Sequence, residues 1–128
     1  MDSTRPVGDD AEALARRCVE ICVEHKGENI TLYDLQGTSM LADYFVFCTA
    51  NSTPHIRALA EHIRVGLSAE NALPRAREGE AVSQWVIMDY GVVIVHIMDA
   101  ERRDFYKIEE LLDPEQAIYR SEELDADA

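Results

Sequence analysis

The stretch from Gln84 to Asp99, QWVIMDYGVVIVHIMD, constrains the fold more than any other part of the chain. Twelve of its 16 positions are apolar, aromatic or glycine, and it holds the only Trp and one of the four His residues. Two β-rich runs flank the turn sequence Asp89-Tyr90-Gly91, and this arrangement predicts a β-hairpin. The fold must therefore contain a sheet built around residues 84–99.

The two faces of this hairpin differ in character. A two-residue turn at Tyr90-Gly91 pairs Asp89 with Val92 and places Trp85 directly opposite His96. One face is then wholly apolar and suits the core: Val86, Met88, Val93, Val95 and Ile97. The other mixes aromatic, charged and aliphatic groups: Trp85, Ile87, Asp89, Val92, Ile94 and His96. Such a face can meet a protein partner around an aromatic anchor, or it can lie beneath a helix.

The remaining elements are read from periodicity and from turn and cap residues. Helices are predicted from Asp9 or Asp10 to Gly27, from Pro54 to about residue 70 with a cap at Ser52 or Thr53, and from about residue 99 to 112, with Phe105, Ile108, Leu111 and Leu112 packed inward. Strands are predicted at residues 30–35, 43–50, 75–77 and in the two arms of the hairpin. The order α β β α β β β α indicates an α/β (α+β) fold, a mixed β-sheet of about five strands flanked by helices.

One domain accounts for the whole chain, because 128 residues with 47% hydrophobic content support a single core. We expect a flexible N-terminus at 1–9, the domain at 10–112 and an acidic mobile tail at 113–128. The N-terminus lacks the basic start and apolar middle of a secretory signal. No apolar run approaches the ~20 residues of a membrane-spanning helix. These features predict a cytosolic protein.

The charge of the chain bears on its partners. It carries 25 acidic residues against 12 Lys and Arg, a net charge of −13. Such a chain repels phosphate backbones and shows no basic stripe with interleaved aromatics, so direct nucleic-acid binding is disfavoured. An acidic domain can instead dock onto a basic protein. The alternative is that the acids serve solubility alone.

Catalytic motifs are scarce. Gly37-Thr38-Ser39 followed by Asp43 resembles a nucleotidyltransferase turn, but Phe45 stands where a second metal-binding carboxylate is needed. Neither a P-loop nor a dinucleotide-binding glycine pattern occurs. Three cysteines without a CxxC pair suggest reduced, packed thiols. The sequence therefore favours a binding module without cofactor or metal over an enzyme.

Several motifs together resemble the Iojap family, the ribosomal silencing factors. The resemblance covers about residues 10–112, and its residues are Asp34-Leu-Gln-Gly37, Ser39, Asp43, Cys48-Thr49, Ser52, Glu78-Gly-Glu80, Trp85-Val-Ile-Met-Asp89-Tyr90-Gly91, Val93-Ile-Val-His96 and Arg103-Asp-Phe-Tyr106-Lys-Ile-Glu109.

The resemblance implies a nucleotidyltransferase-like topology without catalytic residues. It also implies a function: binding protein fourteen of the large ribosomal subunit, which sterically blocks subunit joining and represses translation. It places Trp85 and Tyr90 at the contact surface, and the hairpin geometry adds Asp89 and His96. The resemblance also implies self-association, and a homodimer that hides the same face would compete with ribosome binding. The alternatives are a large-subunit assembly factor and a degenerate nucleotidyltransferase-like protein that binds nucleotides.

Overall fold

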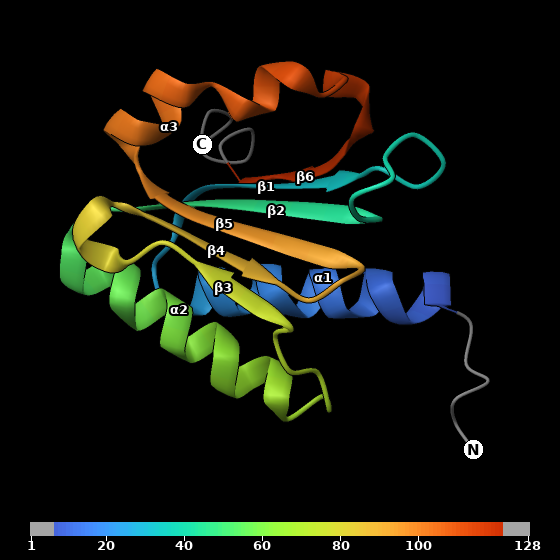
Figure 1. The fold of residues 1–128 in the computed structure, drawn as a ribbon, viewed down its shortest axis with the longest axis horizontal. Coiled ribbons are helices and arrows are strands. Elements are labelled where there is room, and N and C mark those ends of the chain that lie inside the picture. Colours follow the sequence, from blue (N-terminus) through green and yellow to red (C-terminus); the bar gives the residue numbers. More distant parts are fainter. Residues whose placement is uncertain (1–6, 122–128) are drawn as a thin grey trace.

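The fold is built around one mixed sheet of six strands in the order β3-β4-β5-β2-β1-β6 (Figure 1). The structure, a computed structural model, describes residues 7–121. Its strands are β1 (Glu28–Asp34), β2 (Tyr44–Ala50), β3 (Ala76–Glu78), β4 (Trp85–Asp89), β5 (Val93–Asp99) and β6 (Ala117–Arg120). Neighbouring strands are antiparallel except β2 and β5, which run parallel. The predicted α+β architecture is confirmed, with one strand more than the five expected.

Helices cover both faces of this sheet. Figure 1 shows α1 (Val7–Glu24) and α2 (Thr53–Ser68) on one face and α3 (Ala100–Tyr106) on the other. The predicted cap of α2 is confirmed at Ser52, whose side chain accepts a hydrogen bond from the backbone N–H of His55 at 3.1 Å. The first helix begins at Val7, so it overlaps the segment 1–9 that was expected to be flexible.

The main core lies between the sheet and the pair α1 and α2. It takes in the whole apolar face predicted for the hairpin, fully buried in every member: Val86, Met88, Val93, Val95 and Ile97. The three cysteines are free and buried in the same cluster. The hydrogen bond with Cys18, together with burial, raises the pKa of Cys22 well above the usual value, and the hydrogen bond with Cys22, together with burial, does the same for Cys48. The thiols therefore act as packed apolar groups.

The register of the hairpin differs from the predicted one. Ile87 lies opposite His96, and Trp85 lies opposite Met98. The predicted turn needs a positive φ at both central residues, which suits Tyr poorly. The observed turn instead places Gly91, with φ 86°, at its first central position. A shift of two residues keeps the side chains of both strands on their predicted faces but moves His96 away from the position directly opposite Trp85. Val92, which was predicted on the Trp85 face, lies in the turn and packs against the main core.

The segment after β5 is less helical than predicted. Asp99 caps α3 by accepting from the backbone N–H of Arg102 at 2.8 Å, but the helix ends at Tyr106 because Lys107 is left-handed at φ 50°. A short 3₁₀ turn, Ile108–Leu111, follows. The prediction that Phe105 and Leu111 pack inward is wrong, since their side chains are 73% and 83% exposed.

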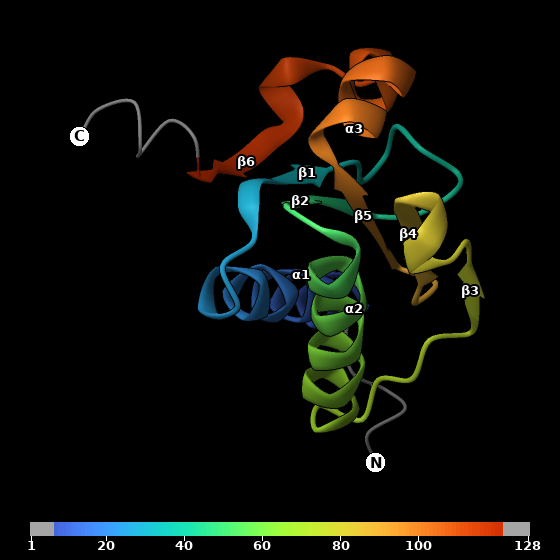
Figure 2. The same ribbon diagram turned by 90° about the vertical axis from the view of Figure 1, so that its left-hand side faces the viewer.

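The sixth strand comes from the segment expected to be a mobile acidic tail. After a 3₁₀ turn at Pro114–Gln116, β6 pairs antiparallel with β1 at the edge of the sheet (Figure 2). The hydroxyl of Ser121 also accepts a hydrogen bond from the backbone N–H of Ile30 at 2.8 Å. The folded body thus reaches at least to residue 121, and the rest of the predicted tail lies outside the described residues.

Candidate functional site

The face of the sheet opposite α1 and α2 carries a second, aromatic cluster. Its buried members are Tyr33, Leu35, Ala42, Phe45, Phe47 and Met98. Trp85 and Ile94 pack against this cluster but stay half-buried. Trp85 in β4 and Ile94 in β5 are therefore more exposed than the buried members of this cluster.

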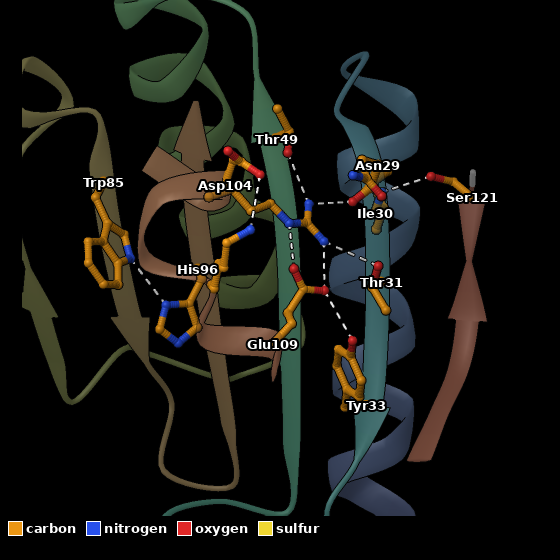
Figure 3. A network of polar contacts seen from close by, with 12 residues as sticks. Asn29, Ile30, Thr31, Tyr33, Thr49, Trp85, His96, Asp104, Glu109 and Ser121 are labelled. Carbon is orange, nitrogen blue, oxygen red and sulfur yellow. Dashed lines mark hydrogen bonds and ion pairs between the residues drawn. The ribbon is translucent and has the colours of Figure 1, made fainter. Parts of the chain in front are cut away.

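Trp85 is held in place by His96. The indole Nε1–H donates to Nδ1 of His96 at 3.2 Å (Figure 3). His96 is 7% exposed and stacks on Phe47, with 4.8 Å between ring centroids. Burial lowers the pKa of His96 from 6.5 to about 4, so the ring is neutral at pH 7 and Nδ1 is free to accept. The structure therefore brings Trp85 and His96 together, with His96 as a packed support rather than a surface residue.

Two further aromatic rings extend the surface of Trp85. The ring of Tyr106 lies 4.8 Å from that of Trp85, and Phe105 meets Tyr106 edge-on at 5.0 Å. Phe105 is 73% exposed and Tyr106 is 48% exposed. We call Trp85, Phe105 and Tyr106 the aromatic ledge. Sequence reasoning missed two of its members because it continued the third helix through Lys107 and turned Phe105 inward.

Arg103 fixes α3 to the sheet beneath the ledge. Its guanidinium makes a bidentate ion pair with Glu109, through Nε at 2.7 Å and Nη2 at 2.9 Å (Figure 3). It also donates to oxygen atoms of β1 and β2: the carbonyl of Asn29 and the hydroxyls of Thr31 and Thr49. The Tyr33 hydroxyl donates to Glu109 at 3.1 Å. This network positions α3, and with it Phe105 and Tyr106.

Asp89 and Tyr90 lie at the turn but on different faces. Asp89 shares the face of Trp85, accepts from the backbone N–H of Gly91 at 2.7 Å and pairs with Arg75 at 3.3 Å. Tyr90 is 9% exposed and belongs to the main core. Burial raises the pKa of Tyr90 to about 12, and its hydroxyl has no hydrogen-bond partner among the described residues. Only Asp89 of the two is available at the surface.

The position where a second metal-binding carboxylate would lie is filled by the core. Phe45 is 8% exposed and packs against Phe47 and His96. Among residues 7–121, no three His, Cys, Asp or Glu side chains are grouped so that they could hold a metal ion.

No helix within residues 7–121 is long and apolar enough to cross a membrane.

Comparisons with known proteins agree on one family. The model of the family described as "Ribosomal silencing factor during starvation" matches residues 8–128. The ribosomal silencing factor of Bacillus subtilis is 32% identical over 100 residues, covering 78% of this chain and 85% of the relative. That of Haemophilus influenzae is 30% identical over 99 residues, covering 77% of this chain and 97% of the relative.

A solved structure has the same fold. The crystal structure of a Chromobacterium violaceum protein superposes with a TM-score of 0.75 at 28% identity, covering 80% of this chain and 88% of that one. The family model and the relatives therefore give the same family, and the solved structure has the same fold. The chain belongs to the family of ribosomal silencing factors.

Proposed function

We propose that this protein binds protein fourteen of the large ribosomal subunit and blocks the small subunit from joining, which represses translation. Membership of the ribosomal silencing factor family is the observation that carries this proposal. Ribosomal proteins are generally basic, and this chain has a net charge of −13. Opposite charges raise the rate of encounter and favour the correct partner. The mechanism is steric, with no turnover and no cofactor, and it places the protein in the cytosol with the ribosomes.

The aromatic ledge is the proposed centre of the contact. Exposed aromatic side chains supply a large area at low entropic cost, and interface energy concentrates on a few such anchors. Phe105 and Tyr106 are exposed, and Trp85 is half-buried beside them. We place Asp89 at the rim of the contact.

The two buried residues of the predicted site have indirect roles in this proposal. His96 orients Trp85 through the hydrogen bond to the indole. Tyr90 supports the turn from inside the core. A substitution of His96 or Tyr90 is expected to alter binding by shifting Trp85 or Asp89. It is not expected to remove a direct contact with the partner.

Phe105→Ala tests the proposal with little risk to folding, because the ring is 73% exposed. Purified large subunits are mixed with the protein, and co-sedimentation and the rate of subunit joining are measured. Loss of an interface anchor costs about 2 kcal/mol, so we expect roughly 30-fold weaker binding and less inhibition of joining. Val65→Ala, on the outer side of α2 and 52% exposed, is the matched control.

Unchanged binding of Phe105→Ala would show that the aromatic ledge is not the centre of the contact with the large subunit. Failure of the wild type to sediment with large subunits, or binding without any effect on joining, would contradict the proposed function itself. If the protein binds large subunits without affecting joining and also binds immature subunits, the results would favour the assembly-factor alternative.

A homodimer that hides the same ledge is the proposed competitor of ribosome binding. The same exposed rings that suit a ribosomal protein also suit a second copy of the chain. Sedimentation equilibrium of the wild type and of Phe105→Ala distinguishes the two uses of the surface. A dimer that forms equally well in both proteins would show that dimerisation uses another face.

A further inference from the structure

An open cavity of about 870 Å³ lies at the end of the sheet where β1 begins and where β2 and β6 end. Its walls are the last turn of α1 at Val23, residues 27–30, Thr49, α3 with the turn that follows it, and Ser121. Figure 2 looks onto this end of the molecule. None of the three residues of the aromatic ledge lines the cavity. We call it the end cavity, and its volume is within the range of small-ligand sites.

The end cavity has a negative lining. Its charged residues sum to −2: Glu28, Asp104, Glu109 and Glu110 against Arg103 and Lys107. The residues directly next to the lining residues in the sequence bring the sum to −3, because they add four acids (Glu24, Asp99, Glu101 and Glu122) and three bases (Lys26, Arg102 and Arg120). The negative end of the α1 dipole also meets the cavity, and the last turn of α1 holds no basic residue.

The two bases of the end cavity are engaged within the protein. All five N–H donors of Arg103 are used, two by the carboxylate of Glu109 and three by oxygen atoms of β1 and β2 (Figure 3). Lys107 lies between two acids, with Nζ 3.4 Å from Asp104 and 3.9 Å from Glu110. Arg103 therefore has no donor left for an anion, and the charge of Lys107 is balanced by its neighbours.

The other lining residues suit an organic cation. Glu28 is exposed, and within residues 7–121 it forms no ion pair. Tyr119 is half-buried and supplies an aromatic ring, a group that attracts guanidinium and ammonium ions. Val23 and Ile30 add apolar surface for the carbon chain of such a cation. A metal ion does not suit this lining, since the described residues contain no group of three side chains that could hold one.

We infer that the end cavity binds an organic cation through a guanidinium or alkylammonium group. The inference goes beyond the proposed function, because the cavity is separate from the aromatic ledge. Two sources carry this chemistry: a free small amine, and a Lys or Arg side chain of a basic protein that is docked on the ledge. The second source is within reach of the ledge, since consecutive residues of α3, Asp104 and Phe105, belong to the cavity and to the ledge.

A titration of the ¹⁵N-labelled protein tests the site directly. Arginine amide and spermidine are the cationic probes, and inorganic phosphate is the probe of opposite charge. We expect saturable shifts of the backbone amides of residues 27–30 with both cations and none with phosphate. Because the acids of the cavity are solvent-exposed, these shifts should shrink as KCl is raised from 0.1 to 1 M.

Two variants with matched controls assign the shifts to the end cavity. Glu28→Gln removes the unpaired carboxylate and should weaken binding of arginine amide roughly fivefold, the usual effect of a screened ion pair. Its control is Glu70→Gln, which removes an exposed acid beyond α2 that also forms no ion pair among residues 7–121. Val23→Lys places an ammonium group of the chain itself at the cavity and should abolish binding. Its control is Val65→Lys on α2, because both valines are 52% exposed.

Affinity for purified large subunits distinguishes the two sources. A loss of roughly tenfold in Val23→Lys, with Val65→Lys unchanged, assigns the cavity to a basic side chain of the subunit. Equal affinity of these two variants assigns it to a free amine.

The inference is overturned if neither cation shifts the amides of residues 27–30. Shifts that are as large in Val23→Lys as in the wild type overturn it too, as does a stronger response to phosphate. Thermal melting checks that each variant folds, and Glu28→Gln keeps the test open if Val23→Lys does not. If the wild type fails to bind large subunits, the proposed function fails, whereas the titration with arginine amide still decides the role of the cavity.

Discussion

Replacing Arg103 by Met should destabilise the protein because it leaves a carboxylate without its partner. The Arg103 side chain is 9% exposed and that of Glu109 is 22% exposed. Breaking a buried ion pair by removing one partner costs about 3–5 kcal/mol. Because solvent still reaches Glu109, we expect the lower end, about 3 kcal/mol of unfolding free energy. The hydroxyls of Thr31 and Thr49, buried in the same network, lose a donor as well.

A double-mutant cycle separates this charge effect from lost packing. Arg103→Met/Glu109→Leu removes both charges, so the double variant should be more stable than the sum of the single changes predicts, by about 2 kcal/mol. Urea titration of the wild type, both single variants and the double variant gives the four free energies. Trp85, the only Trp, reports on the site at the same time. If α3 loosens, the indole of Trp85 should become more exposed and its fluorescence should shift to longer wavelength.

Two results would refute this reasoning. A loss below about 1 kcal/mol in Arg103→Met would mean that the ion pair is no more than an ordinary surface pair. Strict additivity in the cycle would mean that Arg103 stabilises the fold through its other contacts and not through Glu109. Those contacts are the hydrogen bonds to β1 and β2 and the ring of Phe47, over which the guanidinium lies at 5.6 Å.

Three further changes test other parts of the structure. Tyr90→Phe removes a buried hydroxyl that has no partner among the described residues, so it should be neutral or stabilise the protein by about 1 kcal/mol in urea titration; a clear destabilisation would show that the hydroxyl is bonded. Because burial lowers the pKa of His96 from 6.5 to about 4, the unfolded chain binds a proton between these pH values that the folded chain does not. The wild type should therefore lose roughly 3 kcal/mol more than His96→Gln as the pH falls from 6.5 to 4, and equal losses would contradict the burial of a neutral ring. In Gly79→Ala, the new Cβ would lie 2.2 Å from the carbonyl oxygen of Trp85, whereas in Gly37→Ala it meets nothing within 4 Å, although both glycines have φ near +80°. Both variants place Ala at a positive φ, which costs about 1–2 kcal/mol of backbone strain. Only Gly79→Ala should also displace Trp85 and so lose more stability. Equal stability and equal Trp fluorescence in the two variants would rule out the clash.

Much of the site depends on features that local sequence patterns do not predict. The left-handed Lys107 ends α3 at Tyr106, and no pattern in the residues around it marks that break. The consequence is large, since it exposes Phe105 and creates the aromatic ledge. Burial of His96 and Tyr90 likewise depends on what packs against each face of the sheet. The family resemblance brought Tyr90 into the predicted site and the hairpin geometry added His96, but neither showed which of them reaches the surface.

The sequence by itself determined the elements whose cause is local or periodic. Strand alternation set the core face of the hairpin, Ser52 and Pro54 set the start of α2, and the motifs set the family. Tertiary structure decided the rest: the pairing of β6 with β1 and the burial of His96 and Tyr90. These features depend on contacts between residues far apart in the chain. Such contacts form only when the whole core is packed, so no local window of sequence contains them.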